Sequence, residues 1–453
     1  MELNGKNILV VGIGKSGQAV ARFAGARGAA VTMTDLCDEA ALAVHIPELR
    51  QMGVDLVLGQ HPIEIFQQAD LIIVSPGVPH TIKPLELARN RNIPVIGELE
   101  FASRFIHEPV VAVTGTNGKT TTTSLLGEML ALSGKKVFVG GNIGKPLIEY
   151  VEENAGAETV VIEISSFQLD TTRTFRADVA VLLNISKDHL DRYDSFDAYV
   201  ASKGRIFSNQ TSENTAVINL MDPEVKKSAA ACRAKIRPFF HAGRNIAAPE
   251  SGAVIFEDEI IIHSNNGESV SLDLKQASLT GAHNRENIAA AALAALAAGA
   301  TATGIQAAIS SFRPLAHRLE AVDTINGVLY VNDSKGTNVD AVSRALDAIS
   351  RPTVLIMGGR DKGSDYATLT KKLKKTVKQL VLMGEAAGAI EMQLGTTAPV
   401  LNAVDMAQAV KLAAAASGPG DVVLLSPACS SFDMYNSYSQ RGEDFCKQVR
   451  ELK

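Results

Sequence analysis

The 453-residue sequence has no tryptophan and only four cysteines, which are Cys37, Cys232, Cys429 and Cys446. No two of them form a Cys-x-x-Cys pair, so the pattern argues against a zinc site or a disulfide framework and favours a reducing compartment. No apolar run reaches the roughly 18–20 residues that a membrane-spanning helix needs, and the N-terminus lacks a cleavable signal pattern. We therefore expect a cytoplasmic protein with no membrane partner.

Strong charge of either sign is also missing, because the formal net charge is −5. No overall positive field draws nucleic acid to such a protein, so we expect no nucleic-acid partner. Any anionic substrate must then be held by local groups. Hydrophobic residues make up 46% and charged residues 21% of the chain, which is typical of a globular protein. We expect roughly two to four domains and a monomer.

Short apolar runs alternate with helical patterns along most of the chain. Residues 7–35 indicate a strand, a glycine turn, a helix and a second strand, and further strands are predicted at 71–79 and 93–100. Such alternation predicts parallel sheets with helices on their faces. Because it recurs three times, the predicted fold class is α/β with three domains. They are a Rossmann-like N-terminal domain at 1–97, a P-loop-type mononucleotide-binding central domain at 98–312 and a Rossmann-like C-terminal domain at 313–453.

One stretch departs from this alternation. At 253–274 two β-rich runs flank Asn-Asn-Gly, which predicts antiparallel hairpins. The alanine-rich run that follows, at 286–299, predicts a helix because alanine has the highest helix propensity.

The strongest signal for chemistry is the run Thr-Gly-Thr-Asn-Gly-Lys-Thr at 114–120, between a strand and a helix. Backbone N–H groups in such a loop point at phosphate oxygens, and the helix N-terminus adds its positive dipole end. Lys119 is suited to neutralise β- and γ-phosphate charge, and Thr120 to offer a hydroxyl to Mg²⁺. Position 113 is valine, where the common phosphate loop has glycine. The predicted nucleotide-binding residues are Gly115, Thr116, Asn117, Gly118, Lys119, Thr120 and Thr121, with Lys119 also catalytic.

This run resembles the shortened phosphate loop of the Mur ligases and of their relative folylpolyglutamate synthase, and further motifs follow in order along the chain. Gly-x-Gly-x-x-Gly at 12–17, followed by Asp35, indicates a dinucleotide fingerprint by itself. The run Ser-Pro-Gly-Val-Pro at 75–79 resembles a Mur ligase loop, however, and in that family this domain binds a UDP-sugar. The resemblance implies substrate contacts at Gly14, Lys15, Ser16, Asp35, Gly77 and Asn142.

Segments after two buried strands of the central domain point to a metal site. Glu163 ends one strand beside the phosphate loop, where a carboxylate is well placed to hold Mg²⁺. His189 lies in a run that resembles the family motif N-x-x-x-D-H-x-D, although by itself it reads as a structural histidine. Lys203 by itself reads as an exposed lysine, but it matches a lysine that is carbamylated in the family.

The resemblance implies two Mg²⁺ ions, with Mn²⁺ as an alternative, held by Thr120, Glu163, His189 and Lys203. It also implies catalytic roles for His189 and Lys203 and substrate contacts at Ser165 and Gln168.

The remaining nucleotide contacts are expected from the third domain and the alanine-rich helix. Two asparagines three residues apart open that helix, so they lie about one turn apart on one face, although Asn284 also reads as a plain N-cap. A polar run at 332–338 resembles the family motif N-D-S-K-x-T-N. The resemblance implies ATP contacts at Asn284, Asn287, Arg318, Asp333 and Lys335, with Arg318 also catalytic.

Two more polar segments, at 358–362 and 426–433, end strands of the third domain. The second resembles the S-P-A-x-x-S-x-D segment of Mur ligases that add D-glutamate. Arg360 stands where the family often has an acidic residue or leucine, which leaves Asp361 in doubt, and Cys429 is expected to be structural. The implied amino-acid contacts are Thr337, Lys362, Ser431, Phe432 and Tyr438.

Taken together, the resemblance implies a ligase that uses ATP to make an acyl-phosphate and then an amide in peptidoglycan precursor synthesis. Its implied substrates are ATP, UDP-N-acetylmuramoyl-L-alanine and D-glutamate, and the absence of an Asp-Asn-Pro-Arg run favours glutamate over a diamino acid. Alternatives are another Mur ligase step, a ligase like folylpolyglutamate synthase, or an NAD-binding oxidoreductase that uses the fingerprint at 12–35.

Overall fold

The computed structural model describes residues 1–243, 249–264, 267–361 and 363–453. These residues form three α/β domains, each built around one sheet, which confirms the predicted fold class. Contacts divide the chain into two compact units, and the first two sheets share the first unit. The predicted boundaries near 97 and 312 stay predictions. The first unit comprises 1–185, 197–276 and 286–311, and the second comprises 186–196, 277–285 and 312–453.

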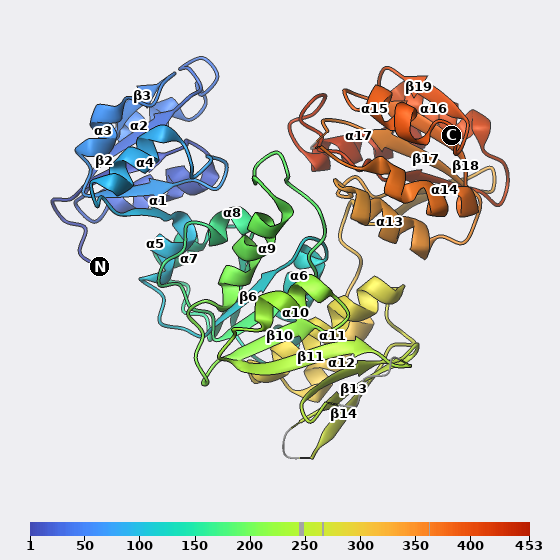
Figure 1. Ribbon diagram of the computed structural model, residues 1–453, viewed down its shortest axis with the longest axis horizontal. Helices are drawn as coiled ribbons and strands as arrows, with labels where there is room; N and C mark the ends of the chain where they lie inside the picture. The colour runs from blue at the N-terminus through green and yellow to red at the C-terminus, as the bar shows by residue number, and fades with distance from the viewer. Residues whose placement is uncertain (244–248, 265–266, 362) are drawn as a thin grey trace. The chain divides into compact units, whose positions relative to one another are not determined.

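The N-terminal sheet, in the blue part of Figure 1, is parallel throughout, with the strand order β3-β2-β1-β4-β5. The order reverses between β1 and β4, and ligands of open α/β sheets bind at such a switch point. The strand predicted at 93–100 is too long, because the chain turns into helix α5 (Glu98–Ser103) directly after β5. The strands are β1 (Asn7–Val11), β2 (Ala30–Asp35), β3 (Asp55–Leu58), β4 (Leu71–Val74) and β5 (Val95–Gly97).

The central sheet has the order β14-β13-β12-β11-β10-β9-β6-β8-β7. Its last three strands in sequence pair antiparallel, which confirms the hairpins predicted at 253–274. Asn265 and Asn266 of the expected turn lie outside the described residues. The strands are β6 (Val110–Thr114), β7 (Val137–Gly141), β8 (Thr159–Glu163), β9 (Val179–Leu182), β10 (Thr215–Asn219), β11 (Lys235–His241), β12 (Gly252–Ile255), β13 (Glu259–His263) and β14 (Ser269–Asp273).

Helix α6 (Lys119–Leu132) packs on this sheet against β6, β7 and β8, and α12 (Ala302–Ser311) packs against α6. The predicted alanine-rich helix is α11 (Ala282–Ala297), which begins four residues earlier than expected. Residues 287–295 of α11 are all buried. A helix apolar on every side belongs in a core, and its first buried residue, Asn287, lies against Gly118 of the phosphate loop.

The C-terminal sheet has the order β15-β16-β20-β17-β18-β19 and is parallel except for the hairpin β15–β16. Consecutive residues of β17 pack into different cores, Leu355 on one face of the sheet and Ile356 on the other. The two-residue period of a strand requires this. Its strands are β15 (Glu320–Ile325), β16 (Val328–Asn332), β17 (Thr353–Gly358), β18 (Val377–Met383), β19 (Val400–Ala403) and β20 (Val422–Leu425).

The sequence argued against a membrane-spanning helix and against a disulfide framework. Across the part of the chain that the structure describes, no helix combines the length and apolarity that crossing a bilayer requires. All four cysteines are described, and each is a free thiol.

A buried carboxylate joins helix α5, which directly follows the N-terminal sheet, to helix α7 (Leu147–Glu153) within the first unit. Glu98 Oε1 accepts a hydrogen bond from the N–H of Ile148, at 2.8 Å, at the start of α7. Its other oxygen, Oε2, is buried without a hydrogen-bond partner among the described residues. Burial raises the pKa of Glu98 to about 7.

We predict that Glu98 makes stability fall as pH rises. Its folded-state pKa of about 7 lies above the ordinary value of 4.5, so the folded state holds more protons between these values. The free energy of unfolding therefore falls through this window and levels off above it. In Glu98→Gln this dependence should disappear. The free energy of unfolding of the variant, relative to that of wild type, should therefore rise by roughly 1–3 kcal/mol between pH 5 and pH 8. Urea denaturation at several pH values measures this, with exposed Glu213→Gln as control, and a pH-independent difference would contradict it.

Candidate active site

The phosphate loop connects β6 to α6 at the middle of the central sheet. Its first anchor is Thr114, whose Oγ1 donates to the carbonyl of Ile164 at 2.7 Å. Gly118 has φ +87°, and a Cβ there would lie 2.3 Å from Oδ1 of Asn287. Only glycine meets both conditions without strain, so the turn into α6 brings the helix N-terminus and an adenine-site candidate side by side.

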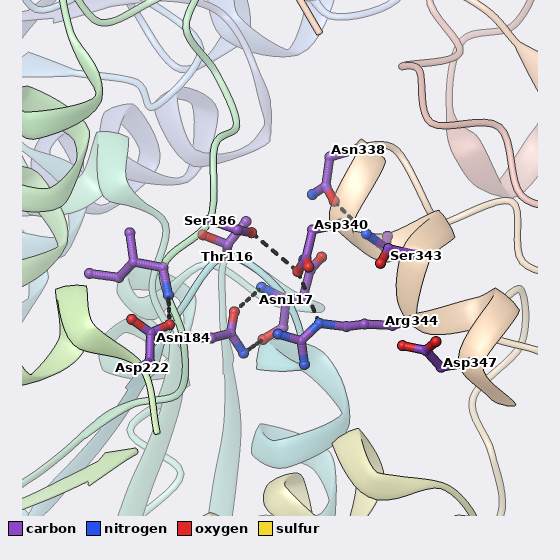
Figure 2. A network of polar contacts seen from close by, with 12 residues as sticks. Thr116, Asn117, Asn184, Ser186, Asp222, Asn338, Asp340, Ser343, Arg344 and Asp347 are labelled. Atoms are coloured by element: carbon purple, nitrogen blue, oxygen red, sulfur yellow. Dashed lines mark hydrogen bonds and ion pairs between the residues drawn. The ribbon is translucent and has the colours of Figure 1, made fainter. Parts of the chain in front are cut away.

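Asn184 fixes the conformation of this loop (Figure 2). Its Oδ1 accepts from the N–H of Asn117 at 2.8 Å, and its Nδ2 donates to the carbonyl of Asn117 at 3.0 Å. Its own carbonyl accepts from the N–H of Thr116 at 2.9 Å. The next residue, Ile185, donates its N–H to Asp222 Oδ2 at 2.7 Å. The loop is therefore held in shape by the segment that follows the neighbouring strand β9.

Two lysine ammonium groups converge on one carbonyl of the loop. Nζ of Lys119 donates to the carbonyls of Gly115 and Thr116, at 2.9 and 2.8 Å. Nζ of Lys203 donates to the same Gly115 carbonyl at 2.8 Å and lies 4.7 Å from the ring centroid of Tyr199. Lys203 is only 1% exposed, so reading it as a surface lysine is wrong. This concentration of positive charge suits a polyanion.

Glu163 lies at the end of the neighbouring strand β8. Its Oε1 accepts from Nδ2 of Asn142 at 2.8 Å, whereas Oε2 is buried and has no hydrogen-bond partner among the described residues. A buried, unpaired carboxylate oxygen is unfavourable unless a cation or donor joins it, so Glu163 fits a metal ligand. Within the described ranges no cluster of three His, Cys, Asp or Glu side chains forms a metal site by itself. Mg²⁺ typically uses one or two carboxylates together with substrate phosphates.

His189 belongs to the second compact unit, whereas the other three predicted metal ligands belong to the first. It has φ +55°, and its N–H donates to Oδ1 of Asp188 at 2.8 Å. Oδ2 of Asp188 accepts from Nδ2 of Asn338 at 2.9 Å. These residues line a cavity of about 390 Å³ in the second unit. The metal role of His189 stays a prediction.

The predicted substrate residues of the N-terminal domain surround the switch point between β1 and β4. Oδ2 of Asp35 accepts from the N–H of Ile13 at 2.8 Å and so holds the glycine turn. Nζ of Lys15 donates to the carbonyl of Gly144 at 2.7 Å, next to the loop of Asn142. Gly14 and Gly77 are exposed, and Ser16 is half-buried. The structure thus places this set at one edge of the sheet.

Other predicted residues of the central domain have local structural partners. Ser165 caps the short helix α8 (Ser166–Leu169), and Gln168 completes the capping box by bonding back to Ser165. Asn284 Nδ2 donates to the carbonyl of Thr280 at 2.9 Å. Asn287 Oδ1 accepts from Oγ1 of Thr122 in α6 at 3.4 Å. Their predicted contacts with substrate and adenine stay predictions.

The second unit collects the predicted residues of the C-terminal domain at the carboxyl ends of its strands. Asp333 is buried, with Oδ2 accepting from Ser426 Oγ at 2.7 Å, and burial raises its pKa to about 7 although nearby Arg318 lowers it. Nζ of Lys335 lies 4.8 Å from the ring centroid of Tyr438. Tyr438 is the first residue of helix α17 (Tyr438–Arg450). Thr337 follows in the same loop.

The predicted amino-acid residues lie on the loops after β17 and β20. The two loops pair backbone to backbone, with the N–H of Arg360 donating to the carbonyl of Ser430 at 2.9 Å. Ser431 is buried, and Phe432 is 62% exposed. Lys362 lies outside the described residues. Burial raises the pKa of Cys429 to about 11, so it stays a thiol near neutral pH, which agrees with the structural role expected for it.

Sequence reasoning missed two residues that organise these loops. Asn184 is the first residue of the run that resembles the motif N-x-x-x-D-H-x-D, but no signal in the sequence indicates that it binds the phosphate loop. Arg441, in α17, is 2% exposed and contacts three loops of the C-terminal domain. An arginine in the first turn of a helix, where the dipole disfavours a cation, was the one available signal.

Three family models match the chain in order. A Mur ligase MurD-like N-terminal domain matches residues 6–97, a Mur ligase middle domain matches 113–295 and a Mur ligase glutamate ligase domain matches 317–429. The curated relatives include the UDP-N-acetylmuramoylalanine--D-glutamate ligase of Desulfosudis oleivorans, 49% identical over 100% of this chain and 98% of the relative. The ligase of the same name from Desulfatibacillum aliphaticivorans is also 49% identical, over 100% of both chains.

Solved structures agree on the fold. A pseudomurein peptide ligase type C from Methanothermus fervidus has a TM-score of 0.64 at 19% identity, covering 99% of this chain and 100% of that one. UDP-N-acetylmuramate-alanine ligase from Thermotoga maritima has a TM-score of 0.60 at 18% identity, with the same coverage.

We predict that Asn184→Ala loosens the phosphate loop. The variant loses both side-chain hydrogen bonds to Asn117, which should lower the free energy of unfolding by roughly 1–3 kcal/mol and raise the Kd for ATP about tenfold. Isothermal titration with ATP and Mg²⁺, together with urea denaturation, measures both effects. Asn219→Ala is the matched control, because Asn219 is also buried at a strand end but bonds to Met221. Equal ATP affinity in the two variants would refute the role of Asn184.

Proposed function

This chain belongs to the Mur ligase family, and on that premise we propose that it joins D-glutamate to UDP-N-acetylmuramoyl-L-alanine. It is an ATP-dependent ligase that forms an amide bond, and its place is in peptidoglycan precursor synthesis. The observation that carries the proposal is the phosphate loop, where the ammonium group of Lys119 donates to the carbonyls of Gly115 and Thr116 at the N-terminus of α6. We expect a monomer acting in the cytoplasm.

In the first step, a carboxylate oxygen of the UDP-linked substrate attacks the γ-phosphorus of ATP. The bond from that phosphorus to the ADP oxygen breaks, which leaves an acyl-phosphate. Both reactants are anions, so positive charge must be in place before they meet. Lys119 and the loop N–H groups supply that charge, while Lys15 and Gly77 belong to the set that holds the UDP-linked substrate.

In the second step, the amine nitrogen of D-glutamate attacks the carbonyl carbon of the acyl-phosphate. The bond from that carbon to the phosphate oxygen breaks, inorganic phosphate leaves, and the nitrogen loses a proton. Thr337, Ser431 and Tyr438 are assigned to orient the amino acid, because orientation supplies much of the rate in such a transfer. Arg318 is assigned to the ATP phosphates, which it can bind bidentately.

Two Mg²⁺ ions, or Mn²⁺, belong to the proposal. Glu163 fits as a ligand through its unpaired buried oxygen, and Thr120 and His189 complete the set with Lys203. As an ammonium group Lys203 would repel a cation, so it fits this role only when carbamylated, which turns it into an anion. When bound, the metal would neutralise the developing charge on the transferred phosphoryl group.

The N-terminal sheet bears on the oxidoreductase alternative. It has five strands, β3-β2-β1-β4-β5, whereas a two-half dinucleotide-binding domain has six. This favours a UDP-linked ligand over NAD. Another Mur ligase step and a ligase like folylpolyglutamate synthase remain as alternatives, and the substrate panel described next separates them.

We predict that phosphate release from ATP and Mg²⁺ requires both UDP-N-acetylmuramoyl-L-alanine and D-glutamate. A panel of D- and L-amino acids with either this acceptor or a folate measures it.

Lys119→Ala should lower the rate by roughly 10²–10³-fold or more, because the loop loses its main cation, while affinity for the UDP-linked substrate stays within about twofold. Exposed Lys136→Ala is the control. Full turnover by Lys119→Ala, or turnover with folate alone, would overturn the proposal.

We predict that Glu163→Gln weakens the response to Mg²⁺. The amide keeps the size of the side chain but removes the negative charge that attracts the ion, so the Mg²⁺ concentration for half-maximal activity should rise about tenfold or more. Activity measured against Mg²⁺ at saturating ATP tests this. Glu158→Gln is the control, because Glu158 is exposed one residue before the same strand. An unchanged Mg²⁺ midpoint in Glu163→Gln would remove Glu163 from the ligand set.

A further inference from the structure

Arg441 occupies an unfavourable position for a cation. It lies in the first turn of α17, where the positive end of the helix dipole repels positive charge, and its side chain is almost completely buried. Burial lowers its pKa to about 10, so it is still a cation near neutral pH. A buried charge is maintained only by well-made hydrogen bonds, and these show what the residue holds.

The guanidinium has five N–H groups, and five oxygens at the ends of β16, β17 and β20 or in the loops after them accept from them. Nε donates to Ser334 Oγ at 3.0 Å, and Nη2 donates to the carbonyls of Ser334 and Cys429, at 2.9 and 3.1 Å. Nη1 donates to the carbonyls of Ser430 and Gly358, at 3.3 and 3.4 Å. A planar fork with donors on both sides is what lets one side chain bridge three loops.

These loops follow β16, β17 and β20, and they carry the residues assigned to the amino acid. Ser430 directly precedes Ser431 and Phe432, and Gly358 precedes the Gly-Arg-Asp-Lys segment. Gly359 leaves room for the arginine, since a Cβ there would lie 2.2 Å from the carbonyl oxygen of Ser430 and 3.0 Å from Nη1 of Arg441. The backbone around the guanidinium is therefore shaped to admit it.

The contact to Ser334 extends the same network to an assigned ligand residue. Ser334 Oγ accepts from Arg441 Nε and donates to the carbonyl of Tyr438 at 2.8 Å. Because the arginine can only donate, it sets the direction in which the hydroxyl donates. The first residue of α17 is thus oriented by a residue three positions further along the same helix.

We propose that Arg441 is a positioning residue for the amino-acid substrate, because it fixes the loops after β17 and β20 at the spacing that binding requires. The inference rests on the proposed function, in which those loops receive D-glutamate. Arg441 does not touch the substrate, since its N–H groups are occupied by the protein. An apolar side chain would fill the space at less desolvation cost. A purely structural role therefore does not explain why an arginine with five hydrogen bonds occupies this position.

The test is steady-state kinetics of the full-length enzyme carrying Arg441→Lys. Lysine keeps the charge but has three donors at one point, so it cannot bridge the loops. The KM for the amino acid should rise roughly tenfold or more, while the KM for the UDP-linked substrate stays within about twofold. A fold that is merely weakened lowers the amount of active enzyme, which changes the maximal rate but leaves KM unchanged. Arg450→Lys, an exposed arginine on the same helix, is the matched control.

Each outcome separates this inference from the proposed function. An unchanged amino-acid KM in a folded Arg441→Lys enzyme overturns the positioning role and leaves the ligase assignment intact. Arg441→Met tests full loss of the hydrogen bonds, and if it does not fold, the lysine variant decides alone. If wild type uses an amino acid other than D-glutamate, the KM for that amino acid is the readout. If no amino acid supports phosphate release by wild type, both proposals fall.

Discussion

The hydrogen bonds between Asn184 and Asn117 are the constraint on which the central site depends. Strands β6 and β9 are parallel neighbours, so the loops that leave their carboxyl ends meet, and the asparagine joins them through both its oxygen and its nitrogen. With the loop held in this shape, the carbonyl of Gly115 faces Lys119 and Lys203. In the proposed function, the positive charge of Lys119 is therefore in place before ATP arrives, which is how preorganised sites lower a barrier.

Both compact units bury charged side chains close to the carboxyl ends of their strands. Lys203 and Glu163 lie buried in the first unit, and Asp333 and Arg441 lie buried in the second. Each of these charges is destabilising by itself, because removal from water outweighs most single contacts. In the proposed function Glu163 and carbamylated Lys203 hold the metal, whereas Arg441 acts through backbone carbonyls. Function in this enzyme is thus attributed to groups that stability alone does not favour.

Much of the fold was predictable because apolar runs and glycine turns are local signals. The parallel sheets and the hairpins at 253–274 follow from them, whereas β3 and β15 were missed because short, half-buried strands have weak patterns. The phosphate loop was predictable from spacing. The burial of Lys203 was not predictable, because its partner Gly115 lies 88 positions away in the sequence. The contacts of Arg441 were not predictable either, because they bring together three separate segments of the chain.

The central claim is that a carboxylate oxygen of the UDP-linked substrate attacks the γ-phosphorus beside Lys119. The direct measurement uses UDP-N-acetylmuramoyl-L-alanine labelled with ¹⁸O in its alanine carboxylate, turned over with ATP and D-glutamate and followed by mass spectrometry of the released phosphate. Because the acyl-phosphate carries that oxygen and loses it with the phosphate, the account predicts one ¹⁸O atom in each inorganic phosphate. Phosphate free of label would contradict it.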